Sequence, residues 1–198
     1  MPTYFDLSVS LLEIEPRIWR RFQLNANSSF ETLHHAIQDS FGWKRRHLYE
    51  FRYINETKSR PSICRIARCR EAEILDNEIV PFADELKIAS IFAKNNDRCV
   101  YLYDFGDGWN HLVYLKDVVE SRERFTRKLV DGAMACPPED CGGPIGYEQM
   151  LEYLGMTGEQ VAKLGEAERP EVEWLRKRYR GWMPNSCDST SARVSFDT

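Results

Sequence analysis

The sequence predicts an α+β fold in which an antiparallel sheet packs against a few helices, and three observations support this class. Several short segments alternate apolar and polar residues, as strands with one buried face do. One segment near the N-terminus repeats its apolar residues at helical spacing behind a serine-rich start. Further helix signals follow the strand signals, from residue 147 onward, so sheet and helices are expected to pack as layers.

The first two strands are expected at residues 3–12 and 17–24, separated by a turn at Pro16. Both segments alternate, so one face of each should be buried against the core. On the first strand that face carries Phe5, Leu7, Val9 and Leu11, and on the second Ile18, Arg20, Phe22 and Leu24.

A helix is expected over residues 29–41, because Ser28 and Glu31 fit a capping box and Gly42 suits the position after a helix end. A strand at 47–54 should follow. Residues 55–80 are polar and weakly periodic, which indicates an insertion or a long surface loop.

The clearest strand pair is 100–105 with 109–115, and its register decides where a histidine lies. If Asp107-Gly108 forms a two-residue turn, Asp104 faces His111 across the strands. If Gly106 joins the turn, His111 moves opposite Tyr103 instead. The first register predicts an imidazole oriented by a carboxylate, for chemistry or simply to satisfy two buried polar groups.

A second dense segment runs from Cys136 to Pro144 and holds two prolines, two acids and two glycines. Pro137 and Pro138 restrict the backbone, so Glu139 and Asp140 are expected on a rigid loop without regular structure. Such a loop suits a functional site, and equally a structural role beside the next helix.

The C-terminal part should add helices from about Tyr147, from Thr157 to Leu164, and from Pro170 to Tyr179. Residues 185–198 are polar and are expected to form a frayed tail. These elements predict one domain over 1–184 that includes the insertion at 55–80.

Aromatic side chains of these segments could line a ligand cleft, although aromatic residues at alternating strand positions are more often part of the core. A divalent metal is a possible cofactor, since imidazole, carboxylate and thiolate are metal ligands. The candidate ligands for a metal are His34, His47, His111, Cys136 and Cys141. The pairs Cys64/Cys69 and Cys136/Cys141 offer a tetrathiolate site as an alternative.

The net charge of −4 conceals an uneven distribution along the chain. Residues 1–70 carry 12 lysines and arginines against 7 acids, whereas the remaining residues carry 15 against 24. The basic N-terminal third predicts a possible nucleic-acid partner, unless the two halves neutralise each other. No apolar run is long enough to span a membrane and no secretory signal is present, so a cytoplasmic location is expected.

The motifs resemble the plasmid pRiA4b ORF-3-like family. The matching segments are 14–21, 30–34, 41–43 with His47, Leu48 and Phe51, 103–109 with His111, and 136–147. The resemblance covers residues 3 to about 155, and it implies an α+β domain in a prokaryotic setting often linked to mobile elements. It implies no reaction. The family's motifs contain His34, His47, Asp104, Asp107, Trp109, His111, Glu139 and Asp140, so the resemblance implies a shared pocket at the hairpin and at the loop that carries Glu139 and Asp140.

Two functions are predicted from these observations. The first is a non-enzymatic binding or accessory module linked to mobile DNA, with a polar and aromatic pocket. The second is a metal-dependent phosphoester hydrolase that uses the histidine and carboxylate cluster to activate water. A purely structural role of the motifs is a third possibility.

Overall fold

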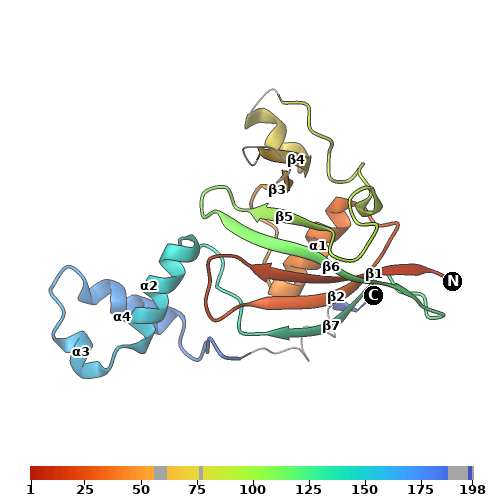
Figure 1. Ribbon diagram of the computed structural model, residues 1–198. Coiled ribbons are helices and arrows are strands. Elements are labelled where there is room, and N and C mark those ends of the chain that lie inside the picture. The colour runs from red at the N-terminus through yellow and green to blue at the C-terminus, as the bar shows by residue number, and fades with distance from the viewer. Residues whose placement is uncertain (56–61, 76–77, 187–195, 198) are drawn as a thin grey trace.

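The computed structural model describes residues 1–55, 62–75, 78–186 and 196–197. It contains a seven-stranded antiparallel sheet with helices, which confirms the predicted α+β class (Figure 1). The strand order is β4-β3-β5-β6-β1-β2-β7. Their bounds are β1 Thr3–Leu11, β2 Trp19–Asn25, β3 Tyr49–Asn55, β4 Ser62–Arg68, β5 Arg98–Tyr103, β6 Trp109–Glu120 and β7 Arg127–Ala133.

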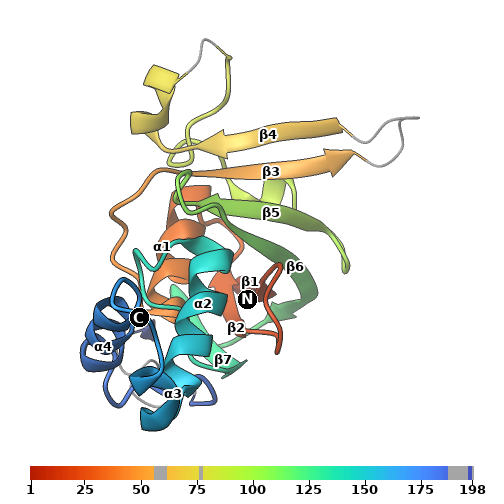
Figure 2. The same ribbon diagram turned by 90° about the vertical axis from the view of Figure 1, so that its left-hand side faces the viewer.

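One face of the sheet forms the core with helix α1 (Phe30–Phe41), which lies across it (Figures 1 and 2). In the centre Leu7 pairs with both Phe22 and Leu115, and all three side chains are fully buried. The predicted inward faces of the first two strands are confirmed, because all eight of their residues are buried. Aromatic side chains of β3, β5 and β6 continue the same face toward α1.

The ends of α1 follow from local chemistry. The N-cap is Ser29, whose hydroxyl accepts a hydrogen bond from the backbone N–H of Thr32, so the prediction of Ser28 was wrong by one residue. Gly42 lies in the left-handed region at φ 76°, as predicted for the residue after the helix.

On the opposite face of the sheet, ion pairs join neighbouring strands. Asp6 on β1 receives two hydrogen bonds from the Arg21 guanidinium on β2. Glu50 on β3 is almost fully buried and pairs with Arg52 and Arg65. These pairs satisfy carboxylates that would be costly to bury alone.

The expectation of a long surface loop at 55–80 was wrong where the structure describes it. Residues 62–68 form β4 beside β3, and a 3₁₀ helix, η1, follows at Arg70–Leu75. Ile66 and Ala67 are buried, but the arginines around them concealed the strand pattern. Residues 56–61 and 76–77 lie outside the described part of the chain. A further short 3₁₀ helix, η2, covers Ile88–Ser90.

Both expected registers of the β5–β6 hairpin were wrong. Tyr103 pairs with Trp109 and Tyr101 with His111, so the loop contains five residues, 104–108. Asp104 makes this loop stable: its side chain accepts hydrogen bonds from the N–H groups of Gly106 and Asp107. Its own carbonyl accepts one from Gly108. Strand β6 also continues beyond the expected end at residue 115, to Glu120.

The C-terminal helices gather beyond the sheet end that carries the β5–β6 loop (Figures 1 and 2). They are α2 Gly143–Gly155, α3 Gly158–Ala162 and α4 Arg169–Arg178. Helix α2 begins earlier than expected, inside the glycine–proline segment, because Pro144 occupies the first turn, where no N–H is needed. Tyr153, Val161 and Val172 form a small second core between these helices.

Residues of the predicted tail also contribute to the core. Phe196 is fully buried against Phe22, and the Arg127 guanidinium lies over its ring. The expectation of a frayed end is therefore wrong for residues 196–197, while 187–195 lie outside the described residues. Within the described residues, no helix is long and apolar enough to cross a membrane.

Candidate functional site

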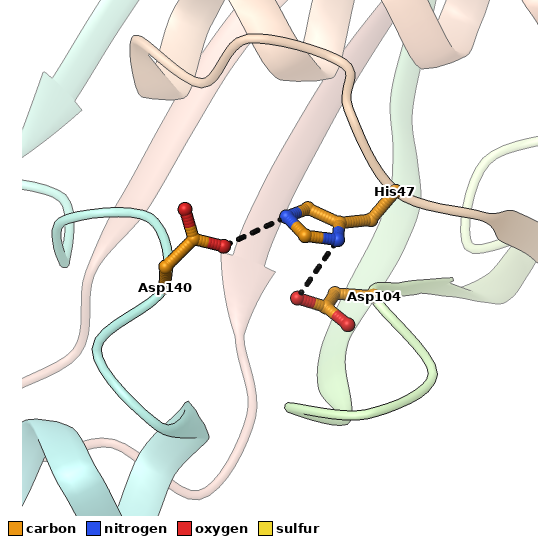
Figure 3. A group of neighbouring side chains, drawn as sticks. All are labelled: His47, Asp104 and Asp140. Atoms are coloured by element: carbon orange, nitrogen blue, oxygen red, sulfur yellow. Dashed lines mark hydrogen bonds and ion pairs between the residues drawn. The ribbon is translucent and has the colours of Figure 1, made fainter.

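Three of the predicted pocket residues meet at one point, although they are far apart in the sequence. The ring of His47 lies between Asp140 and Asp104, with its Nε2 2.8 Å and its Nδ1 3.4 Å from a carboxylate oxygen (Figure 3). One donor atom from each of the three residues lies within 4.8 Å of the others. Among the described residues this is the one group of histidine, cysteine and acidic side chains close enough to share a metal ion.

These three residues, here called the His47 centre, each come from a different connection between helices or strands (Figure 3). His47 follows α1 on the way to β3, Asp104 opens the β5–β6 loop, and Asp140 precedes α2. The Asp104 N–H donates to the carbonyl of Leu48, which fixes the loop beside the segment that carries His47. The centre therefore forms only when the sheet and α1 have packed together with the loop of residues 136–142 that carries Asp140, here called the acidic loop.

The backbone at both carboxylates is unusual. Asp104 has φ 56° and Asp140 has φ 59°, so both lie in the left-handed region. Residues other than glycine, asparagine and aspartate rarely adopt this backbone conformation. Arg45, two residues before His47, is also left-handed at φ 58°. Such conformations persist only where surrounding contacts maintain them, and they concentrate at functional sites.

The acidic loop is joined to the hairpin loop by close backbone contacts. Asp107 accepts a hydrogen bond from the N–H of Gly142. A Cβ on Gly143 would lie 2.2 Å from the Asp107 carbonyl oxygen, so only glycine fits at this contact. Asp107 thus positions Asp140 and does not belong to the group around His47.

Glu139 points to the other side of the loop. Its carboxylate accepts hydrogen bonds from the Tyr103 hydroxyl at 2.8 Å and from the Lys44 N–H at 2.9 Å. Burial, together with the bond to Glu139, raises the pKa of Tyr103 and keeps it protonated as a donor. Glu139 therefore attaches the acidic loop to β5 and to the segment before His47.

His111 and Trp109 lie in the core and not in the centre. His111 is fully buried against Phe41, Trp43 and Tyr101. Burial lowers its pKa to about 4, against the smaller effect of hydrogen bonds to the Tyr101 and Trp109 carbonyls. Within the described residues its Nε2 has no hydrogen-bond partner. The predicted Asp104–His111 pair does not form, because the register places His111 opposite Tyr101.

His34 is separate from the centre as well. It is buried on α1, its ring stacks on Tyr49 at 3.7 Å between ring centres, and its Nδ1 lies 2.7 Å from the Tyr101 hydroxyl. Burial, followed by the neighbouring His35 and Arg45, lowers its pKa to about 2.

The cysteines do not gather into a metal site in the part of the chain that the structure describes. The sulfur of Cys136 accepts a hydrogen bond from the buried guanidinium of Arg20. Burial and the nearby Asp107 raise the pKa of Cys141 to about 12, which disfavours the thiolate that a metal needs. Cys69 lies with β3, where its sulfur accepts from the N–H of Tyr49.

Two clefts flank the His47 centre. One has a volume of about 350 Å³ and includes His34, His35, Arg45, Arg46 and His47 in its lining. The other, of about 360 Å³, includes Trp43, Lys44, Arg46, Asp140, Tyr179 and Trp182. Arg46 lines both clefts.

The basic run at 44–46 belongs to the N-terminal third that predicts a nucleic-acid partner, yet Arg46 lines both clefts beside the centre. Its position between two predicted pocket residues, His34 and His47, was the available signal for a role in the site.

Known proteins resemble this chain in both sequence and fold. The family model for the plasmid pRiA4b ORF-3-like protein matches residues 3–191. An uncharacterised protein of Sinorhizobium fredii, y4hQ, is 31% identical over 151 residues, which cover 75% of this chain and 71% of that protein. The crystal structure of MM3350 from Methanosarcina mazei Go1, a protein of unknown function, is similar with a TM-score of 0.75. That comparison has 28% identity and covers 96% of this chain and 98% of the other. The chain therefore belongs to the plasmid pRiA4b ORF-3-like protein family.

Proposed function

We propose that this protein is a ligand-binding module whose His47, Asp104 and Asp140 hold a divalent cation beside an open cleft. The observation that carries the proposal is the convergence of one imidazole and two carboxylates from three separate connections. Nitrogen and oxygen donors of this kind suit zinc, manganese or iron(II), and three protein ligands leave coordination positions for a ligand or water.

The exposure of the three side chains supports binding from solution. Asp104 is 13% exposed and held by two backbone N–H groups, whereas His47 is 30% and Asp140 62% exposed. One carboxylate is therefore fixed in advance, and the side that carries Asp140 is open to an incoming ion.

The test is calorimetric titration of chelator-treated protein with Zn²⁺ and Mn²⁺. We expect one ion per chain, and at least about 100-fold weaker affinity in His47→Gln, Asp104→Asn and Asp140→Asn, since outer partners of metal ligands alone contribute about 10- to 100-fold. Asparagine tolerates the left-handed backbone, so these changes remove charge without adding strain.

Glu148→Gln is the matched control, because Glu148 is an exposed acid on α2, outside the centre. Wild-type affinity in all three site variants would show that the centre is an ion-pair network and would refute the proposal.

Phosphoester hydrolysis is the second candidate function. It is favoured by the two carboxylates facing the two ring nitrogens of His47, an arrangement that can orient an imidazole for proton transfer. We expect the metal-loaded protein to hydrolyse bis(p-nitrophenyl) phosphate, and His47→Gln to reduce the rate by about 100-fold or more. A rate equal to that of free metal would leave binding as the function.

The link to mobile DNA remains part of the proposal. It is supported by the plasmid origin in the family's name and by the basic N-terminal third of the sequence. A cation-binding module in such a setting would serve as an accessory to the element that carries it.

A further inference from the structure

The cleft of about 350 Å³ beside His47 has a buried histidine in its lining, and a chain of hydrogen bonds determines the state of that histidine. The chain begins at the backbone N–H of Arg45, which can only donate and is bonded to the Gln38 side-chain oxygen. The Gln38 amide nitrogen must then be the group that faces the Tyr101 hydroxyl at 3.1 Å, and it donates to that oxygen.

The hydroxyl of Tyr101 fixes the next step. Its oxygen accepts from Gln38, and its single hydrogen has one neighbour to which it can be donated, His34 Nδ1 at 2.7 Å. The reverse arrangement would leave a fully buried hydroxyl hydrogen without an acceptor, which is costly. His34 therefore carries its proton on Nε2.

This Nε2–H group is free to bind a ligand. His34 is only 3% exposed and lines the cleft, yet its Nε2 makes no hydrogen bond within the described residues. Because burial, His35 and Arg45 lower the pKa of His34 to about 2, the ring stays neutral and presents a donor, not a base.

The same cleft is lined by the arginines Arg45, Arg46, Arg68 and Arg70 and by the acids Glu31, Glu71 and Asp84. Arg45 is paired with Asp39, and Arg70 with Asp84 and Glu85, so the charges of these two arginines are already balanced. Arg46 makes no side-chain hydrogen bond or ion pair within the described residues, so its guanidinium is available. Burial is the main cause that lowers the pKa of His35 too, followed by Arg45, against the opposing effect of Glu31 and Asp39.

We propose that this cleft binds the phosphate group of a small molecule, with the His34 Nε2–H as a recessed donor and Arg46 as the cation at the rim. Guanidinium and N–H groups donate hydrogen bonds to phosphate oxygens. A donor deep in a cleft reaches the terminal phosphate of a small molecule better than a phosphate within a polymer backbone. The inference rests on the proposed function, because it names the class of ligand that the binding module takes. The cleft adjoins the cation centre, since His47 belongs to both.

The test is titration of the full chain with inorganic phosphate in the presence of chelator, followed by calorimetry and by nitrogen–proton NMR of the histidine rings. We expect the His34 ring to show an unprotonated Nδ1 and a protonated Nε2, and the Nε2–H signal to shift when phosphate binds. Arg46→Met and Tyr101→Phe should each weaken binding by about 10-fold or more, since hydrogen bonds to charged groups are among the stronger ones.

Arg124→Met is the matched control, because Arg124 is exposed outside the cleft, and its affinity should equal that of wild type. Absence of phosphate binding, unmoved His34 signals, or equal affinity for acetate would overturn the inference. The NMR readout uses wild-type protein, so it holds even if Tyr101→Phe fails to fold. Because phosphate is titrated in chelator and the cation without phosphate, failure here is distinguishable from failure of the cation proposal.

Discussion

The histidines show how strongly the surroundings determine the chemistry of one residue type. His34 and His111 are buried among aromatic rings, and burial is the main cause that lowers the pKa of each. His47 instead lies between two carboxylates near the surface. Only His47 is placed to bind a cation, although all three were equal candidates in the sequence.

The buried histidines predict that acid destabilises the protein. The pKa of His111 is about 4 and that of His34 about 2 in the folded state, below the usual 6.5 of the unfolded chain. Unfolded protein therefore binds more protons, and stability is lost as pH falls below 6.5. Urea unfolding at pH 7.5 and 5.5 should show a loss of about 1.4 kcal/mol for each histidine.

The variant His111→Phe separates this effect from other titrations. A phenyl ring suits the contacts with Phe41 and Trp43 and removes the nitrogen without a partner. The variant should reduce the pH-dependent change by about 1.4 kcal/mol, the contribution of one histidine. An unchanged pH dependence would contradict the prediction, as would an imidazole signal of His111 in wild type that titrates near pH 6.5.

At the scale of elements, the junction between the acidic loop and α2 holds the candidate site in place. A Cβ on Gly146 would lie 2.0 Å from the Cys141 carbonyl oxygen, inside the loop that carries Asp140. We predict that Gly146→Ala displaces this loop, destabilises the protein by about 1–3 kcal/mol and weakens cation binding. Urea unfolding and calorimetry with Zn²⁺ measure the two effects.

The same helix provides the control. Gly155 ends α2, and a Cβ added there would meet no atom within 4 Å, so Gly155→Ala should be neutral or stabilising by up to about 1 kcal/mol. If both alanine variants had the stability and cation affinity of wild type, the close contact at Gly146 would be of no importance for the site.

Elements specified by neighbouring residues could be predicted from the sequence. The alternation in β1 and β2, the glycine after α1 and the start of a helix at Thr157 were all predicted correctly. Each depends on contacts within a few residues, which a single sequence displays.

Features that depend on distant partners could not be predicted. Strand β4 was missed because Arg65 is stabilised by Glu50 on the neighbouring strand, a pairing invisible in a polar segment. The hairpin register was missed because the Asp104 side chain supports a longer loop. The His47 centre requires the acidic loop to dock beside the hairpin, so its members could be named as candidates but not grouped.

At the scale of the molecule, much of the basic charge of the first 70 residues is neutralised internally. Arg21, Arg65 and Arg70 pair with Asp6, Glu50 and Asp84. Among the described cations of this region, Lys44 and Arg46 make no side-chain hydrogen bond or ion pair. The electrostatic field available to a nucleic acid is therefore smaller than the sequence suggests.

This distribution gives a quantitative prediction for DNA. Binding to duplex DNA at low salt, followed by fluorescence anisotropy, should depend on salt with a logarithmic slope of about −2 to −3, since each neutralised phosphate contributes about −0.9. Replacing both Lys44 and Arg46 by methionine should reduce the slope by about two units, while Lys163→Met should not. Absence of DNA binding at low salt would remove the nucleic-acid partner.

The order of strands also has a consequence for synthesis. Strand β1 lies between β2 and β6 near the middle of the sheet, yet about a hundred residues separate it from β6. A ribosome adds about 5–20 residues per second, so the β1–β2 hairpin waits roughly 5–20 s with its backbone donors and acceptors unpaired along one side. During that interval the nascent chain would be a natural client for a chaperone.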